Sequence, residues 1–232
     1  YREHSDEKED YLPPLGLGYI TTQLLKDGID ASIVDCVKER FGLTSIFEIL
    51  KQEAPDYIGI NIFTQNYEIV KEIVEKCPIN TSIIIGGQVV KCIYNDILQW
   101  EVHNKLIIVI GEGEFIIPAI IKGDCCEKPI FESEAKFVYR VDKNSFYFPK
   151  DLSVSFLDRS LFNDYTIVNH YGEHEAAIVT SRGCLYNCAF CGGAHNLNKD
   201  ITIRYRPISD VEQEIRTITH MNPSITSIRM LD

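Results

Sequence analysis

Short apolar runs alternate with amphipathic stretches along the first half of this chain, and this alternation constrains the fold more than any other feature. Apolar residues at helical spacing predict helices that follow Pro14, cover about 44–53, follow Asn66, lie near 92–100 and cover 115–121. The runs between them predict strands at 31–36, 57–63, 82–87 and 105–114. These strands are apolar on both faces, which is typical of a sheet covered by helices, so we predict an α/β fold with a Rossmann-like, doubly wound parallel sheet.

Three of the predicted strands end in glycine-containing or polar turns. These turns read FTQN at 63–66, GGQ at 86–88 and GEGE at 111–114. Parallel sheets of this kind bind ligands at the carboxyl ends of their strands. The glycines either let a bulky ligand approach the backbone or simply permit tight turns, and the pattern alone leaves both interpretations open.

The alternation stops after residue 122 and resumes at 175. Residues 123–174 are predicted to link two domains, 1–122 and 175–232, and to contain a hairpin whose bend lies at Asp142–Asn144. In the last part, AAIVTS predicts a strand, residues 207–220 a helix and SITSIRML a second strand. This is one βαβ unit and the start of a larger structure.

Composition excludes several classes of function. A formal net charge of -11 argues against a general nucleic-acid binder, because neutralising phosphates requires a basic surface. No apolar run reaches the length of a membrane helix, and no signal peptide is recognisable. Eight cysteines without a secretory signal indicate a reducing compartment, so we expect a cytoplasmic protein whose five scattered cysteines are mostly small buried hydrophobes.

Residues 183–191 read GCLYNCAFC and place Cys184, Cys188 and Cys191 close together. A disulfide with one free thiol fits a reducing compartment poorly. A Cys3His zinc site that uses His195 is possible in principle, although zinc sites usually show CxxC knuckles. The third interpretation is an iron–sulfur cluster. Cubane clusters normally take four thiolates, so three would leave one iron open to a substrate or cofactor.

At this point the sequence resembles a known family. GCLYNCAFC fits the CxxxCxΦC signature of the radical S-adenosylmethionine enzymes, in which Φ is aromatic, and it follows a strand as it does in their partial β/α barrel. The resemblance implies that Cys184, Cys188 and Cys191 hold a [4Fe–4S] cluster. It also implies that S-adenosylmethionine chelates the fourth iron, that Phe190 lies beside its adenine, and that its reductive cleavage yields a 5′-deoxyadenosyl radical.

The upstream half resembles the cobalamin-binding domain that precedes the barrel in one subclass of this family. PPLGLGYITTQLLKDGIDASIVD, IGINIFTQNY, IIIGGQVV and GEGE match that domain in order and spacing. The resemblance implies corrinoid contacts from Leu15, Gly16, Thr64, Gln65, Gly86, Gly87, Gln88, Gly111, Glu112 and Gly113. The Asp-x-His-x-x-Gly motif of many corrinoid proteins is absent, since Arg2 stands two positions before His4. We therefore predict that no protein histidine coordinates cobalt.

This subclass commonly transfers a methyl group to an unreactive carbon or phosphorus centre, and some members cyclise, oxidise or rearrange instead. The resemblance thus implies a methyltransferase that acts on a small molecule or a peptide, with an electron donor such as flavodoxin or ferredoxin. The chain begins at Tyr1 and ends at Asp232 inside an apolar-patterned run. We expect the first strand of the sheet and most of the barrel to lie outside it, and this length of chain to be inactive by itself.

Three alternatives remain. The methylthiotransferase subclass carries a second cluster on three upstream cysteines, for which Cys36, Cys77 and Cys92 are the candidates here. A non-catalytic corrinoid or metal-binding module would keep the cofactor without turnover. An NAD-binding domain is the weakest alternative, because GLG at 16–18 lies inside a predicted helix and no GxGxxG follows a first strand.

Overall fold

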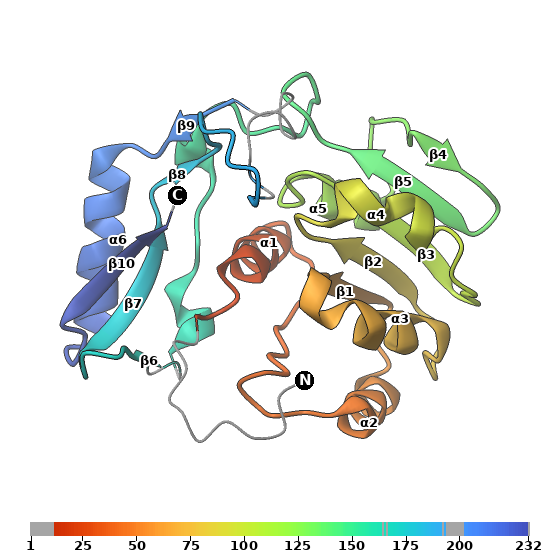
Figure 1. The fold of residues 1–232 in the computed structure, drawn as a ribbon, viewed down its shortest axis with the longest axis horizontal. Helices are drawn as coiled ribbons and strands as arrows, with labels where there is room; N and C mark the ends of the chain where they lie inside the picture. Colours follow the sequence, from red (N-terminus) through yellow and green to blue (C-terminus); the bar gives the residue numbers. More distant parts are fainter. Residues whose placement is uncertain (1–11, 164, 166, 192, 194–201, 232) are drawn as a thin grey trace. The chain divides into compact units, whose positions relative to one another are not determined.

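A five-stranded sheet organises residues 34–148 (Figure 1). Its strand order is β1-β2-β3-β5-β4, with the first four strands parallel and β4 antiparallel to β5. The strands are β1 (Tyr57–Asn61), β2 (Ser82–Gly86), β3 (Lys105–Ile110), β4 (Phe131–Glu132) and β5 (Lys136–Arg140). This computed structural model describes residues 12–163, 165, 167–191, 193 and 202–231.

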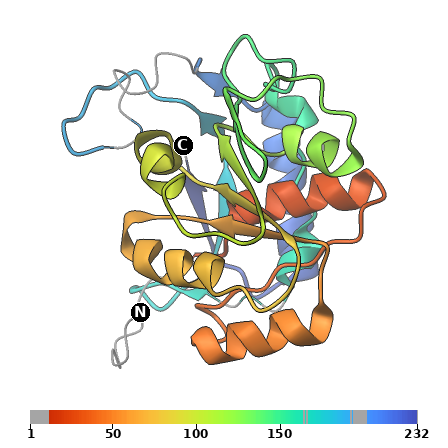
Figure 2. The same cartoon turned by 90° about the vertical axis from the view of Figure 1, so that its right-hand side faces the viewer.

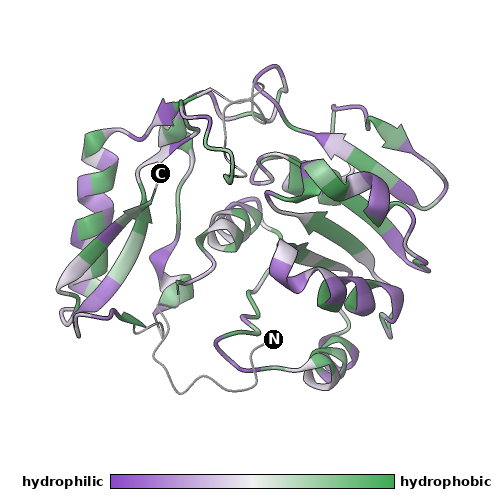
Figure 3. Ribbon diagram, in the orientation of Figure 1, coloured by the Kyte–Doolittle hydropathy of each residue, from purple (hydrophilic) through white to green (hydrophobic). Residues whose placement is uncertain are grey.

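Helices lie between successive strands, as the alternation predicts. They are α3 (Tyr67–Glu75), α4 (Val90–Ile97) and α5 (Ile116–Lys122), while α2 (Leu43–Glu53) precedes β1. Figures 1 and 2 show α3 and α4 lying along the sheet, where Val74 and Val90 pack into one core with Ile85 and Ile108. Ile84 and Ile107, which point to the opposite face, are also buried. Figure 3 shows how apolar β2 and β3 are along their length, and the predicted α/β fold with a parallel sheet is confirmed.

The second compact unit combines Tyr1–Ile33 with Pro149–Asp232. A three-stranded sheet of order β10-β7-β6 lies at its centre, and β7 and β10 run parallel. Its elements are α1 (Leu15–Lys26), η2 (Leu152–Val154), η3 (Arg159–Phe162), β6 (Ile167–Val168), β7 (His174–Val179), β8 (Ser181–Arg182), β9 (Arg204–Tyr205), α6 (Ile208–Met221) and β10 (Ser227–Leu231). The predicted βαβ unit is therefore β7–α6–β10.

Helix α1 packs into this second unit through a small apolar core. Leu15 and Tyr19 from α1 contact Phe162 of η3 and the fully buried Ala177 of β7. Gly18 permits this approach, because a Cβ there would lie 2.6 Å from the Phe162 ring. No helix in the described ranges is both long enough and apolar enough to cross a membrane.

Two sequence predictions of local structure are wrong. Residues 31–36 form no strand, and Val34 is 48% exposed. Their apolar, β-branched composition favours a strand, but a strand also needs a partner for its backbone groups, and no described segment pairs with this one. The predicted hairpin bend at Asp142–Asn144 is only a turn. Strand β5 pairs with β4 before it, so the bend lies at 133–135, and Val138 of β5 fills the core.

The range predicted as a linker supplies elements to both compact units. Its earlier part contributes β4 and β5 to the five-stranded sheet, and its later part contributes η2, η3 and β6 to the second unit.

Gly111 provides a test of how the sheet is packed. Its φ is +101°, and a Cβ there would overlap the carbonyl oxygen of Val141. We expect Gly111→Ala to lower the free energy of unfolding by about 2–4 kcal/mol, measured by urea denaturation. The matched control is Gly59→Ala in β1, where a Cβ meets no heavy atom within 4 Å. Equal stability of the two variants would contradict the backbone geometry described for Gly111.

Candidate functional site

The carboxyl ends of β1, β2 and β3 lie at one edge of the five-stranded sheet. The Cα atoms of Asn61 and Gly86 are register partners, as are those of Ile85 and Ile108. The segments that follow are η1 (Thr64–Asn66), the turn at Gly86–Gln88 and the turn at 111–113. Thr64, Gln65 and Gln88 are all exposed. The fold therefore brings together predicted ligand residues that are far apart in the sequence.

Asn66 holds the first of these segments in place. Its Oδ1 accepts a hydrogen bond from the Phe63 backbone N–H at 2.7 Å, and its Nδ2 donates to the Asn61 carbonyl oxygen at 3.0 Å. The side chain does not cap α3, which begins at Tyr67. It instead fixes the turn that presents the Thr64 hydroxyl and the Gln65 amide.

The glycines at this edge have different reasons to be glycine. Gly87 and Gly111 have φ values of +127° and +101°, and a Cβ on Gly87 would lie 2.5 Å from the Ile62 carbonyl oxygen. Tight backbone packing therefore explains both residues. Gly86 has no left-handed φ, and a Cβ there would meet only the Val109 carbonyl oxygen at 3.9 Å. Gly86 thus leaves open space where a ligand can approach the backbone.

Asn61 belongs to the same edge, although the sequence analysis did not single it out. Its Oδ1 is buried and has no hydrogen-bond partner among the described residues. Leaving such an acceptor unpaired costs about 1–3 kcal/mol, a cost that a bound N–H donor would remove. The signal in the sequence was a polar residue at the end of an otherwise apolar strand. An unpaired amide oxygen beside the open Gly86 position fits a ligand with amide groups on its rim.

The two predicted ligand residues upstream lie on α1, in the other compact unit. Leu15 is 5% exposed and packs in the core of that unit, whereas Gly16 is exposed and a Cβ there would meet nothing within 4 Å. Of this pair, Gly16 alone has a backbone that an outside group can reach.

The three clustered cysteines lie on one exposed loop that follows β8. Cys184, Cys188 and Cys191 are free and exposed, and the ring of Phe190 is 93% exposed. The Tyr186 N–H donates to the Cys184 Sγ at 3.4 Å, and the Cys191 N–H donates to the Cys188 carbonyl oxygen at 3.1 Å. A loop with three accessible thiols has the donor chemistry that iron–sulfur clusters require.

In this conformation the sulfur atoms are not gathered around one point. Within the ranges that the structure describes, no group of three or more His, Cys, Asp or Glu side chains is arranged to hold a metal ion. His195, the candidate fourth zinc ligand, lies outside those ranges. The loop thus offers suitable thiols whose convergence must accompany binding of the metal.

The five scattered cysteines are less buried than predicted. Cys36, Cys77 and Cys125 are half-buried, and Cys92 and Cys126 are exposed. Desolvation by partial burial raises the pKa of the Cys36 thiol, and the neighbouring Asp35 carboxylate raises it further. Cys92 lies at an exposed position on α4 and Cys126 in an exposed loop, where packing does not select for a small apolar side chain.

The cysteine loop is closed at its base by a short strand pair. β8 and β9 are antiparallel, with Ser181 opposite Tyr205 and Arg182 opposite Arg204. Gly183 has a φ of +94°, and a Cβ there would lie 2.9 Å from the Thr202 carbonyl oxygen. Only glycine therefore lets the two arms of the loop approach so closely.

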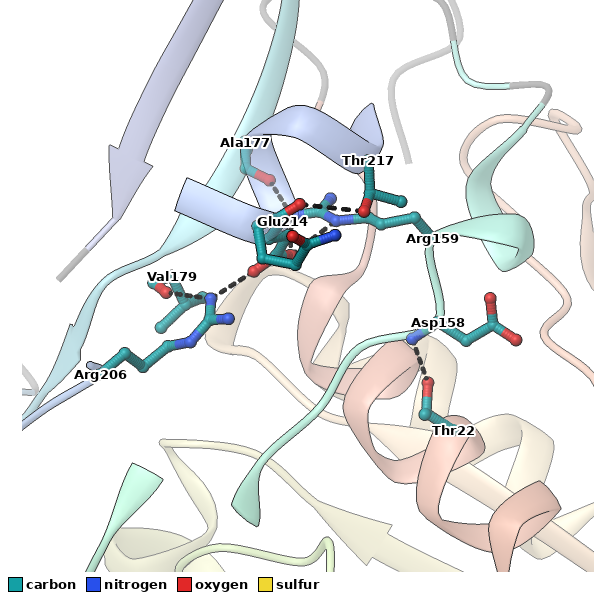
Figure 4. A network of polar contacts seen from close by, with 9 residues as sticks. Thr22, Asp158, Arg159, Ala177, Val179, Arg206, Glu214 and Thr217 are labelled. Atoms are coloured by element: carbon teal, nitrogen blue, oxygen red, sulfur yellow. Dashed lines mark hydrogen bonds and ion pairs between the residues drawn. The ribbon is translucent and has the colours of Figure 1, made fainter. Parts of the chain in front are cut away.

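Arg204 and Arg206, which flank Tyr205 at the end of the cysteine loop, are both buried. The Arg204 Nη1 donates to the Pro149 carbonyl oxygen at 2.6 Å. Arg206 binds Glu214, which also binds Arg159 (Figure 4). Each arginine has a backbone or carboxylate acceptor supplied by a distant segment, and spacing in the sequence does not reveal such acceptors.

Tyr19 of α1 lies close to these charges. The Arg182 guanidinium stands 5.0 Å from the centre of its ring, within cation–π range. Burial raises the pKa of the Tyr19 hydroxyl, the Glu214 carboxylate raises it further, and the nearby arginines oppose both effects. Arg182, which immediately precedes Gly183, therefore packs against α1.

Comparisons with known proteins agree with this architecture. Residues 7–121 match the family model described as B12 binding domain. An uncharacterised methyltransferase of Pyrococcus horikoshii is 27% identical over 232 residues, which cover 95% of this chain and 48% of the relative. A putative methylthiotransferase of Methanocaldococcus jannaschii is 28% identical over 162 residues, covering 69% of this chain and 33% of the relative.

Solved structures share the fold. The radical S-adenosylmethionine methyltransferase TsrM from Kitasatospora setae, with tryptophan substrate and the analogue aza-SAM bound, matches with a TM-score of 0.66 at 17% identity, over 97% of this chain and 46% of that one. TsrM with cobalamin and a [4Fe-4S] cluster bound matches with a TM-score of 0.65 at 17% identity, over 97% of this chain and 47% of that one. The chain thus spans about half, or less, of the length of the proteins that it matches.

The exposure of the loop thiols predicts their reactivity. In the metal-free folded protein, we expect iodoacetamide to alkylate Cys184, Cys188 and Cys191 at least about tenfold faster than Cys36, whose thiolate is disfavoured by burial. Peptide mass spectrometry after timed quenching measures each site. Exposed Cys126 is the matched control and should react as the loop thiols do. Unfolding in urea should remove the difference, and equal rates before unfolding would contradict the burial of Cys36.

Proposed function

Residues 7–121 of this chain belong to the B12-binding domain family, and from this premise we propose that the complete protein is a cobalamin-dependent radical S-adenosylmethionine methyltransferase. One observation carries the proposal. The same chain holds a B12-binding domain and, downstream, an exposed loop with thiols at the spacing CxxxCxΦC. The family resemblance drawn from the motifs is confirmed by the B12-binding match together with the fold shared with TsrM.

The edge of the five-stranded sheet would hold cobalamin. Its backbone is approachable at Gly86, and the Thr64 hydroxyl and the Gln65 and Gln88 amides are exposed beside it. Hydroxyl and amide groups suit the amide-bearing rim of a corrin ring, and the unpaired Asn61 Oδ1 suits an incoming N–H donor. Gly87 and Gly111 shape the turns that present these groups.

The cysteine loop would hold the [4Fe–4S] cluster through Cys184, Cys188 and Cys191. When bound, the cluster and S-adenosylmethionine would supply a 5′-deoxyadenosyl radical, and cobalamin would carry the methyl group to an unactivated carbon or phosphorus centre. Three thiolates leave one iron for the amino and carboxylate groups of S-adenosylmethionine, and the exposed Phe190 ring is available to its adenine. The required electron would come from a donor such as flavodoxin or ferredoxin.

A second candidate follows from the relative named a putative methylthiotransferase. That function would need a second cluster on upstream cysteines. Cys36, Cys77 and Cys92 lie on three separate segments, in a turn, beside the end of α3 and on α4. They do not repeat the close CxxxCxΦC spacing of the loop thiols, and this difference favours a single cluster and the methyltransferase.

The radical step can be tested on the full-length protein. After anaerobic reconstitution and reduction, we expect about four irons per chain and release of 5′-deoxyadenosine from S-adenosylmethionine, both measured directly. Cys184→Ala should reduce 5′-deoxyadenosine release at least about hundredfold, because the cluster loses one of its thiolates. The control Cys126→Ala should retain both properties.

Other results would redirect the assignment. About eight irons per chain would favour the methylthiotransferase. A protein that keeps four irons but releases no 5′-deoxyadenosine would contradict the radical mechanism. If Cys184→Ala keeps its corrinoid and still performs the role of the natural protein in the cell, the protein is a corrinoid-binding module without radical chemistry.

The open position at Gly86 predicts where cobalamin binds. We expect Gly86→Ala to weaken cobalamin binding about tenfold or more, because its methyl group would occupy space at the approachable backbone, while the urea midpoint stays unchanged. Absorbance spectra of the protein after desalting measure retention, with Gly59→Ala as the matched control. Unchanged retention in Gly86→Ala would place the corrinoid elsewhere. The same spectra should show no histidine nitrogen on cobalt, including that of His4, which lies outside the described residues.

A further inference from the structure

Strand β7 has an edge that, among the described residues, no other strand covers along its second half. The Thr180 N–H donates to the Leu231 carbonyl oxygen, and the His174 carbonyl oxygen accepts from the Thr226 N–H. The backbone N–H and C=O groups of even-numbered residues along β7 therefore point toward β10. Alternate residues of a strand point their backbone groups to opposite edges. The backbone groups of Ala177 and Val179 therefore face away from β10. Within the described ranges, β6 pairs with the beginning of β7, at His174 and Glu175.

Two buried arginines occupy this open edge. The Arg159 Nη2 donates to the Ala177 carbonyl oxygen at 2.8 Å, and the Arg206 Nη1 donates to the Val179 carbonyl oxygen at 2.9 Å. These hydrogen bonds satisfy backbone oxygens that a neighbouring strand would otherwise satisfy. The guanidinium groups thus take the place of a neighbouring strand along the part of β7 that precedes the cysteine loop.

Glu214 of α6 is the counter-ion that both arginines share (Figure 4). Its Oε1 accepts from the Arg159 Nε at 2.7 Å, and its Oε2 accepts from the Arg206 Nη1. All three side chains are at most 7% exposed. A buried pair that loses one partner leaves an uncompensated charge, so Arg159 and Arg206 cannot both keep these positions without the carboxylate.

Arg206 transmits this constraint to the base of the cysteine loop. It directly follows β9, and its backbone N–H donates to the Thr180 carbonyl oxygen at 3.0 Å, immediately before β8. The pair β8–β9 closes the loop that carries Cys184, Cys188 and Cys191. One arginine therefore ties the two ends of that loop to β7 and, through Glu214, to α6.

We propose that Glu214 is a positioning residue for the cysteine loop: by holding Arg206 and Arg159 at the open edge of β7, it fixes the strand pair from which the three thiols extend. Its link to catalysis rests on the proposed function, since the thiols matter only if they bind the cluster. Glu214 itself binds arginine side chains, so its effect on the thiols is indirect.

Hydrogen exchange on the metal-free full-length protein tests the positioning role. In Glu214→Gln we expect the backbone amides of β8, β9 and residues 183–191 to exchange at least about tenfold faster than in the natural protein. The amides of β2 and β3, which lie in the other compact unit, should be unchanged. Mass spectrometry of peptic peptides resolves these segments.

The matched control is Glu212→Gln on the same helix. Glu212 binds Arg216 at 2.6 Å on the surface, where the two side chains are 59% and 71% exposed. This change removes the same charge from α6 but leaves β7 untouched, so loop exchange should not change. Faster exchange in both variants, or uniformly faster exchange across β7, α1 and β10 in Glu214→Gln, would show a general loss of stability and overturn the proposal.

A second variant covers the case in which Glu214→Gln does not fold. Arg159→Met combined with Glu214→Gln removes one charge of each sign and keeps the local charge balance. We expect this double variant to fold and still to show faster exchange in residues 183–191, because Arg206 has lost its carboxylate. Natural exchange rates there would overturn the proposal.

Iron retention separates this proposal from the proposed function. After anaerobic reconstitution and desalting, Glu214→Gln should lose at least about half of the iron that Glu212→Gln retains. If the natural protein takes up no cluster, the proposed function fails, yet the exchange experiment still decides whether Glu214 positions the loop. If the loop exchanges faster but iron is fully retained, the positioning of the cluster is overturned while the proposed function stands.

Discussion

The parallel pairing of β1, β2 and β3 is the constraint on which the candidate cofactor site depends. Parallel strands in register end at the same edge, and here Asn61 pairs with Gly86 and Ile85 with Ile108. The segments that follow are therefore neighbours, although each begins more than 20 residues after the one before it in the chain. Burial of these strands on both faces excludes water from their backbone groups, so a shift in register would leave buried N–H and C=O groups without hydrogen-bond partners.

Glycine has two distinct functions at this edge. The backbone itself requires glycine at 87 and 111, because left-handed φ values and close carbonyl oxygens exclude a side chain at Gly87 and Gly111. Gly86 has neither a left-handed φ nor a close carbonyl oxygen, and its backbone stays accessible. The distinction matters for function. A glycine that the turn requires gives no information about a ligand, whereas a glycine that the backbone does not require indicates space for a bound ligand.

Buried ion pairs hold the base of the cysteine loop in the second compact unit. Glu214 is the shared counter-ion of two arginines that complete the open edge of β7. One of them, Arg206, directly follows the strand pair at the base of the cysteine loop. The exposed loop is thus anchored to a buried, charged base. Such an arrangement leaves the thiols accessible to a metal while limiting how far the ends of the loop can move.

The sequence by itself determined the α/β class, the positions of most helices and strands, and the family indicated by the spacing of three cysteines. These features are encoded locally, in the period of apolar residues and in the spacing of thiols along a few turns of chain. Tertiary structure decided that residues 31–36 remain outside the sheet, that Arg204 and Arg206 are buried, and that Gly86 differs from Gly87. The reason is that strand pairing, burial and counter-ions depend on partners distant in sequence, such as Glu214 for Arg159, and no local pattern identifies those partners.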